Sequence, residues 1–389
     1  MKAVKTVKAA RTLISVILIT VNLMFMTGCW NYREIDKLAI VVGVAIDKGT
    51  TERYKLTVEV ARTTGGKETK TLSKVVSTEG KTVFDAARNA ISVTGDRLYW
   101  SHSKIIILSK EIAAEGFTHI MDWYTRDSET REDVYIMVSE GATAAEILTG
   151  QTVVESIKSI ELSDMLKSQE SLSKAPIMDV LEFDIQSKTK EFSTIIPTVR
   201  LKKADDKTVP QILGTAIIKN DKLAGFLGGE ETKYLLFIRN EVKGGVLVEM
   251  PKDGGTTPVS LEIFKSKTKT KPVVNGKDIE INLNVDVTVA IDEIDGSRNY
   301  IDEDGRKKLE QISETALKQQ IEALIKKVQK EFDADIFKFG LELRNNDINA
   351  WDNMSENWEE IFKDLKVKVK TRVHIKNSAT LAKSFEKGD

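Results

Sequence analysis

The chain contains very little cysteine and histidine for its length. One cysteine, Cys29, and three histidines occur among 389 residues. A single cysteine excludes an internal disulfide, so the folded part must be held together by hydrophobic cores. His102, His119 and His374 are too scattered for a spaced zinc motif. We therefore expect no histidine metal site.

Sequence motifs for enzymatic chemistry are missing as well. The chain has no Gly-x-Ser-x-Gly elbow. Its single thiol is that of Cys29, and attachment of a lipid to this cysteine, which the amino-terminal sequence predicts, would leave no thiol nucleophile. Gly80-Lys81-Thr82 matches the end of a phosphate loop, but Val75 stands where the loop needs its first glycine. We expect Thr82 to start a helix instead, and we expect neither enzymatic activity nor a cofactor.

An acidic stretch at residues 292–305 raises the alternative of a calcium loop. Aligning Gly296 or Gly305 with the glycine of such a loop puts Ile291 or Tyr300 at the first ligand position, where an oxygen ligand is required. The stretch therefore predicts a solvated turn between a strand and a helix.

Neither sign of charge dominates the whole chain. The formal net charge is −1, and it becomes about −5 when the four cations of the first 28 residues are removed. A protein that binds nucleic acid usually carries a basic surface, and none is indicated here. The apolar fraction of 41% and the charged fraction of 30% are typical of a folded, water-soluble body.

Acidic residues are absent from the first 28 positions, which contain Lys2, Lys5, Lys8 and Arg11. An apolar run at residues 12–26 follows these cations. A basic region, a short apolar region and small residues at a cleavage point together predict a secretory signal peptide. The basic end is expected to stay in the cytoplasm.

The cleavage point predicts a lipid attachment site. Cys29 directly follows Thr27 and Gly28, two residues small enough for a signal peptidase, with Met26 at the usual leucine position of a bacterial lipobox. We expect cleavage between Gly28 and Cys29, with diacylglyceryl and N-acyl (palmitate-type) chains on Cys29. Two acyl chains give stable membrane attachment.

An uncleaved signal anchor is the main alternative. As a helix, the 15 residues at 12–26 are about 22 Å long, whereas a bilayer core is about 30 Å thick. Extension to Trp30 nearly reaches that thickness, so length alone does not exclude a span. Either arrangement tethers the rest of the chain to the outside of the cytoplasmic membrane.

The 361 residues after position 28 are too long for one ordinary domain. We expect a signal peptide at 1–28, an N-terminal α+β domain at 29–205 and a C-terminal α+β domain at 206–389. The charged, proline-containing segment 202–210 suggests this boundary. The C-terminal domain is one unit or two lobes, the last containing a long helix at 306–332.

The apolar patterns predict a mixed succession of strands and helices. A strand apolar on both faces at 38–47 should lie centrally in a sheet and pair with a strand at 54–60. Further strands are expected at 75–79, 102–108, 133–138, 192–201, 212–218, 223–227, 245–249, 259–269, 277–291 and 365–375. Helices are expected at 83–93, 110–124, 156–172, 230–239 and 306–332, and an exposed loop at 62–70. The fold class is α+β, with several lobes built from mixed or antiparallel sheets, each flanked by helices.

Several segments in this order resemble the Ger(x)C family, the lipoprotein C subunits of spore germinant receptors. The resembling segments are 29–35 with 38–47, 101–107, 126–131, 213–216 and 335–340, followed by Trp351, Trp358 and 367–375. One departure lies at 341–347, where family members have a His-Arg pair and a proline. Leu343-Arg344 and no proline stand there, so this loop is expected to differ in shape.

The resemblance implies a lipoprotein on the outer face of the inner spore membrane of an endospore former. It implies three α+β lobes, and action with a membrane-spanning A subunit and a permease-like B subunit in nutrient sensing. It supplies no catalytic or ligand-contacting residue. Two rival classes stay open: a solute-binding lipoprotein of a transporter, with two similar lobes around a cleft, and a cell-wall enzyme.

Overall fold

The computed structural model describes residues 2–25, 38–64, 70–250, 258–276, 278–295 and 299–376. The chain divides into two units, Met1–Leu38 and Ala39–Asp389. In the described part of the first unit lies the helix α1 (Lys2–Phe25), which includes most of the predicted apolar run. Within the described ranges, no helix combines the length and the apolar character that crossing a bilayer requires.

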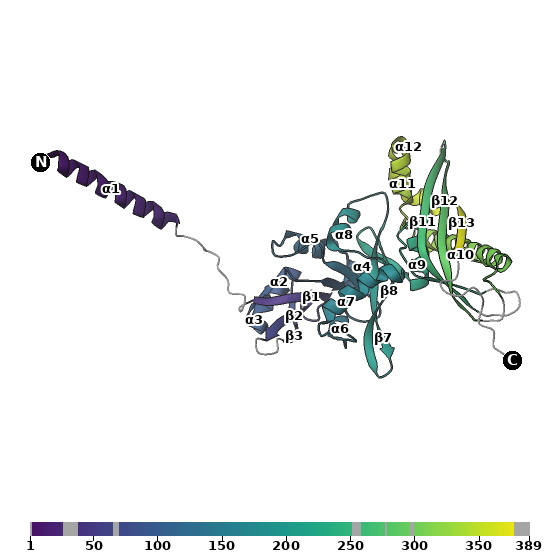
Figure 1. Cartoon of the computed structure of the whole chain (residues 1–389), viewed down its shortest axis with the longest axis horizontal. Helices are drawn as coiled ribbons and strands as arrows, with labels where there is room; N and C mark the ends of the chain where they lie inside the picture. Colours follow the sequence, from purple (N-terminus) through teal and green to yellow (C-terminus); the bar gives the residue numbers. More distant parts are fainter. Residues whose placement is uncertain are drawn as a thin grey trace. The chain divides into compact units, whose positions relative to one another are not determined.

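The second unit begins with a nine-stranded mixed sheet (Figure 1). Its order is β3-β2-β1-β5-β6-β7-β8-β9, with β4 paired to β1. β1, β5, β6 and β7 are parallel to one another, and the remaining neighbours on this path are antiparallel. The strands are β1 (Leu38–Lys48), β2 (Tyr54–Thr64), β3 (Lys70–Gly80), β4 (Arg97–Tyr99), β5 (Ile105–Leu108), β6 (Tyr135–Ser139), β7 (Thr194–Ala204), β8 (Lys207–Lys219) and β9 (Lys222–Leu227).

The apolar character of β1 predicted its place correctly. It lies between β2 and β5, and Val41, Val44 and Ala45 are completely buried. The predicted exposed loop at 62–70 was wrong where the structure describes it. Residues 62–64 and Lys70 continue the β2–β3 ladder, because backbone pairing extends the hairpin beyond its apolar part.

Helices cover both faces of this sheet. One core takes buried side chains from α2 (Val83–Asn89), α4 (Lys110–Glu115), α5 (Thr118–Arg126) and α8 (Val180–Ser187). A core on other strand residues takes them from α6 (Ala144–Thr149) and α7 (Lys158–Lys167), which a 3-10 turn (Ser168–Ser171) follows. The short α3 (Ile91–Thr94) follows α2.

Local chemistry sets the helix boundaries. The Thr82 side chain accepts a hydrogen bond from the Asp85 amide and caps α2, as the sequence predicted. The single helix predicted at 110–124 was wrong, because the chain forms α4 and α5 instead. Gly116 separates them at φ 130°, a conformation that a helix cannot contain.

The second sheet has the order β10-β11-β12-β13 and packs on the long helix α10 (Figure 1). Apolar side chains alternate along β12, and those from Ile279 to Ile291 are buried, as the period of two predicts. The strands are β10 (Val246–Glu249), β11 (Val259–Asn275), β12 (Asp278–Ile294) and β13 (Lys366–Lys376). The helices are α9 (Gly229–Ile238), α10 (Glu303–Glu331), α11 (Phe339–Asn346), α12 (Ile348–Met354) and α13 (Trp358–Lys363), with a 3-10 turn (Ser355–Asn357) before α13.

Two expectations, one about the segment 202–210 and one about the number of sheet-based lobes, need correction. The segment 202–210 is no irregular connection, because β7 and β8 pair across it, with Ala204 opposite Lys207. The expected boundary at 205/206 therefore falls at a hairpin turn inside the first sheet, and the division into domains stays a prediction. The described strands form two sheets, whereas the resemblance implied three sheet-based lobes. The α+β class with mixed, helix-flanked sheets is confirmed.

Candidate functional site

The predicted lipid attachment site, Cys29 with the cleavage point after Gly28, lies outside the described residues. The structure ends its description of α1 at Phe25 and resumes at Leu38. Attachment of lipid to Cys29 therefore stays a prediction from the sequence.

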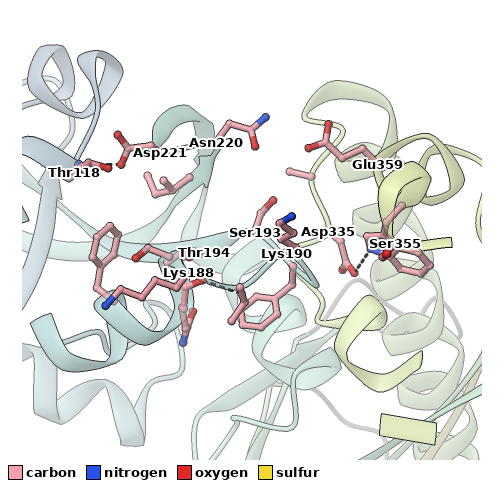
Figure 2. Close-up of a pocket in the computed structure, with 18 of the residues that line it drawn as sticks. Thr118, Lys188, Lys190, Ser193, Thr194, Asn220, Asp221, Asp335, Ser355 and Glu359 are labelled. Atoms are coloured by element: carbon pink, nitrogen blue, oxygen red, sulfur yellow. Dashed lines mark hydrogen bonds between the residues drawn. The ribbon is translucent and has the colours of Figure 1, made fainter. Parts of the chain in front are cut away.

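A cleft of about 940 Å³ opens between the first sheet and the helices that follow α10. In Figure 2, Thr118, Asn220 and Asp221 lie on the side of the first sheet, and Asp335, Ser355 and Glu359 lie on the opposite side. Segment 188–194, which leads into β7, lies between these two sides. Residues far apart in the sequence thus form one concave surface.

Asp335 is the buried acid of this cleft. Its Oδ1 accepts hydrogen bonds from the amides of Phe337 at 3.0 Å and Phe339 at 3.3 Å. Its Oδ2 accepts from the Gly340 amide at 2.8 Å and from Nε1 of Trp358 at 3.1 Å. Four N–H groups therefore satisfy one carboxyl group, and the dashed line beside Asp335 in Figure 2 marks its bond to the indole.

The sequence of this loop suits that geometry. Lys338 has φ 67°, which turns the chain so that the amides around it point back at Asp335. A Cβ on Gly340 would lie 2.2 Å from the carbonyl oxygen of Glu191 and 2.8 Å from Nε1 of Trp358. Only glycine allows these backbones to approach so closely.

Burial raises the pKa of Asp335 to about 6, although its four N–H partners lower it. At neutral pH the group is therefore mostly ionised, with its charge spread over the four donors. No lone pair is left pointing freely into the cleft, which makes Asp335 an organiser of the loop rather than a proton-transfer group.

The Asp335 loop also joins the two halves of the second unit. The carbonyl oxygen of Asp335 accepts a hydrogen bond from the Ser193 amide at 2.8 Å. Arg344 forms an ion pair with Glu191 at 2.5 Å, just before β7. Lys219 of β8 forms an ion pair with Asp333, two residues before Asp335, at 3.2 Å. We call these contacts between the first sheet and the Asp335 loop the joint. Substituting Asp335 should therefore loosen the contact between the two sheets.

Several of the remaining charges of the cleft make local contacts. Lys188 pairs with Asp184 at 2.5 Å. Oδ1 of Asp221 accepts from the amides of Phe117 and Thr118 at 3.2 and 2.9 Å, which stabilises the start of α5. The lining contains no histidine or cysteine to act as a base or thiol nucleophile.

The three histidines do not come together. His102 precedes β5, His119 lies in α5 and His374 lies in β13, where Nδ1 is 3.3 Å from Glu310. Within the ranges that the structure describes, no group of His, Cys, Asp or Glu side chains is arranged to hold a metal ion.

Two other segments that the sequence singled out do meet. The Ser101 hydroxyl donates to the carbonyl oxygen of Glu129 at 2.7 Å, and Arg97 pairs with the Glu129 carboxylate at 2.8 Å. Segments 101–107 and 126–131 therefore meet beside the amino end of β5. Sequence reasoning missed the cleft and the role of Asp335, because the Trp358 donor is 23 residues away and comes close only through packing.

The segment 341–347, which lacks the proline that family members have there, lies mostly in a helix. Residues 339–346 are the continuous helix α11, which contains Leu343 as a buried side chain. A proline inside this helix would remove a backbone donor and break it.

Two family models match the chain in sequence order. The model described as the spore germination protein N-terminal domain matches residues 31–201. The model described as spore germination B3/GerAC like, C-terminal, matches residues 213–379. Together they cover nearly all of the chain after the predicted signal peptide.

Curated relatives from Bacillus subtilis (strain 168) align along nearly their full length. Spore germination protein B3 is 28% identical over 380 residues, covering 93% of this chain and 96% of the relative. Spore germination protein KC is 25% identical, covering 93% and 95%. A crystal structure of the GerBC protein has a TM-score of 0.55 at 22% identity, covering 86% of this chain and 97% of that one, which supports the fold. With two family models matched in order along its length, the chain belongs to the Ger(x)C family of spore germination proteins.

Proposed function

We propose that this protein is the lipid-anchored, non-catalytic C subunit of a nutrient germinant receptor. It would act at the outer face of the inner spore membrane, with a membrane-spanning A subunit and a permease-like B subunit. The observation that carries the proposal is the ordered match of both family models, directly after a lipobox-like sequence.

Lipid attachment is supported by the first 29 residues. Four cations, an apolar run and two small residues precede the single cysteine of the chain. Two acyl chains on Cys29 would hold the body firmly, since each buried methylene contributes about 0.8 kcal/mol.

A non-catalytic role is supported by the geometry of the cleft. Its buried acid, Asp335, is saturated by four N–H donors, and its surface charges Lys188 and Asp184 pair with each other. A catalytic acid or base needs a free position toward its substrate. The side chains of this cleft instead hold the two sheets together.

The rival solute-binding class is disfavoured by topology. It would need two similar lobes around a ligand cleft. The sheets of the described residues have nine and four strands and different strand orders, and the cleft lies between the first sheet and the helices that follow α10. A cell-wall enzyme would need a nucleophile or an acid–base pair, whereas carboxylates of the cleft lining form ion pairs: Asp184 with Lys188, Glu359 with Lys219 and Glu360 with Lys363.

Substitution of Cys29 by alanine tests the proposal. The full-length gene, wild type or C29A, replaces the resident copy in an endospore former. We expect palmitate labelling of the wild-type chain but not of C29A, and a strongly reduced nutrient response of C29A spores. Thr27→Ala is the matched control, because alanine is also small enough for the cleavage site, and it should be labelled and respond as wild type.

Partner capture tests the complex. Wild-type chain solubilised from spore membranes should retain the A or B subunit, whereas a receptor-independent protein should retain neither. A normal nutrient response of C29A spores, or hydrolysis of peptidoglycan by the purified wild-type protein, would overturn the proposal.

A further inference from the structure

Three large apolar side chains are exposed at one end of the first sheet. Leu72 of β3 is 56% exposed, and Ile91 and Val93 of α3 are 37% and 63% exposed. Isolated exposed apolar residues are ordinary, but a group of them marks a contact surface. We call these three side chains the end patch.

Register and one ion pair place the members of the end patch at the same end of the sheet. Leu72 pairs with Arg62 of β2, and Arg62 forms an ion pair with Asp96 at 3.0 Å. Asp96 comes two residues after α3, so the ion pair fixes α3 beside this end of the β2–β3 ladder.

The side chains also share one face of the sheet. Thr78 of β3 donates its hydroxyl to the carbonyl oxygen of Ala86 in α2, so α2 covers the face of Thr78. Side chains at even positions of β3 share that face, because successive residues of a strand alternate. Leu72 therefore points to the face that carries α2 and α3.

The end patch lies where the chain enters the body. Ile40 of β1 pairs with Ala61, and Ala61 pairs with Ser73, so the start of β1 is level with Leu72. Adjacent strands are about 4.8 Å apart, which places the start of β1 about 10 Å from Leu72. The amino end of β1 and the end patch thus occupy one edge of the molecule.

The connection to Cys29 is short. Eight residues lie between Cys29 and Leu38, so nine steps along the backbone join them. At about 3.4 Å each they span at most about 30 Å, even when fully extended. If Cys29 is embedded in the membrane by its acyl chains, the edge that carries the end patch stays within reach of the headgroups.

We propose that the end patch docks on the lipid bilayer and inserts Leu72, Ile91 and Val93 into its interfacial layer. This inference rests on the proposed lipid attachment at Cys29. Lys74 lies on the same strand as Leu72, and its even position puts its side chain on the same face of the sheet. Its ammonium would therefore face the lipid headgroups, where anionic lipids attract cations. Docking would fix the orientation of the body, which the tether alone leaves free.

The single cysteine makes this test direct. Once Cys29 is lipidated, a cysteine introduced at Val93 is the sole free thiol of the chain. Full-length lipidated V93C carries an environment-sensitive fluorophore in vesicles of phosphatidylcholine and phosphatidylglycerol. The vesicles contain lipids with brominated acyl chains, which quench the fluorophore by contact. We expect a blue shift and loss of emission.

Two control positions test whether the contact is local. Val248→Cys has a similar exposed fraction, 58%, but lies on β10 of the second sheet. Thr51→Cys lies in the turn beyond the opposite end of β1. Neither label should be quenched. In a further variant, Leu72→Cys carries the label and Val93→Asp adds a charge, which should reduce quenching at position 72.

The outcomes separate the two proposals. Flotation with the vesicles, together with the mass of the acylated amino terminus, reports lipid attachment by itself. Flotation without quenching at V93C overturns the end-patch proposal and leaves the anchor in place. Equal quenching at V93C, V248C and T51C also overturns it. An unmodified Cys29 on a chain that does not float overturns the anchor and, with it, this inference.

Discussion

Replacing Asp335 by asparagine changes one atom of a buried side chain. The carboxylate accepts four hydrogen bonds, two on each oxygen. An amide of nearly the same shape keeps one accepting oxygen and turns the other into an NH₂ donor. Whichever way the amide is turned, two N–H groups then face a donor instead of an acceptor.

The expected loss of stability follows from those two N–H groups. Leaving a buried donor without an acceptor costs about 1–3 kcal/mol. Two such donors give about 2–6 kcal/mol, against a total stability of about 5–15 kcal/mol for a typical domain. D335N should therefore still fold, with a much lower resistance to denaturant.

Urea unfolding of the full-length protein in detergent, followed by tryptophan emission, measures this change. Trp358 donates to Asp335 and lies 5.5 Å from Trp351, so both indoles report on the joint. Asp352→Asn is the matched control, because Asp352 is exposed on α12. An exposed substitution of this kind should change the free energy of unfolding by less than about 0.5 kcal/mol.

The effect of D335N should also depend on pH. The folded pKa of Asp335 is raised from 3.8 to about 6, first of all by desolvation. Stability from this group is therefore complete below about pH 4 and is lost as the pH rises through about 6. Asparagine does not titrate. The advantage of wild type over D335N should be about 1.4 kcal/mol larger at pH 5 than at pH 7.

Two results would refute this reasoning. An unfolding free energy of D335N within about 0.5 kcal/mol of wild type at pH 7 would mean that the four N–H groups find other acceptors. A wild-type advantage that shrinks toward pH 5 would mean that the donors outweigh desolvation and hold the folded pKa below 3.8.

Two further substitutions test neighbouring features of the fold. Gly340→Ala should lower the free energy of unfolding in urea by about 1–3 kcal/mol, because the new Cβ would lie 2.2 Å from the Glu191 carbonyl oxygen. Gly228→Ala is the control, because a Cβ at Gly228 would have no atom closer than 3.9 Å. Equal stability of the two variants would show that the Asp335 loop can shift away from Glu191. Backbone amides of Thr50, Glu52 and Thr51 donate to Glu79 and lower its pKa to about 2. Glu79→Gln should therefore lower the melting temperature at pH 7, and this difference from wild type should disappear as the pH falls from about 4.5 toward 2. A melting temperature of E79Q equal to wild type at pH 7 would contradict this assignment.

Local patterns in the sequence were enough to predict most elements. The apolar run of β1 and the strict alternation along β12 fix a central strand and a one-sided strand, because burial and period are properties of neighbouring residues. Thr82 was predicted to start α2 because its capping bond spans only three residues. The signal-like amino terminus and Cys29 are likewise visible in a few consecutive letters.

Pairing between distant segments was decided only by the tertiary structure. The β7–β8 hairpin continues through the charged residues near 205. Backbone hydrogen bonds pair the two strands there, and the side-chain pattern does not reveal this pairing. The cleft, the four donors around Asp335 and the end patch each combine segments that are separated in the sequence. Sequence periodicity records which face of an element is buried, but it does not record which other element covers that face. Packing makes that choice, and in this protein it also determines where the exposed apolar side chains gather.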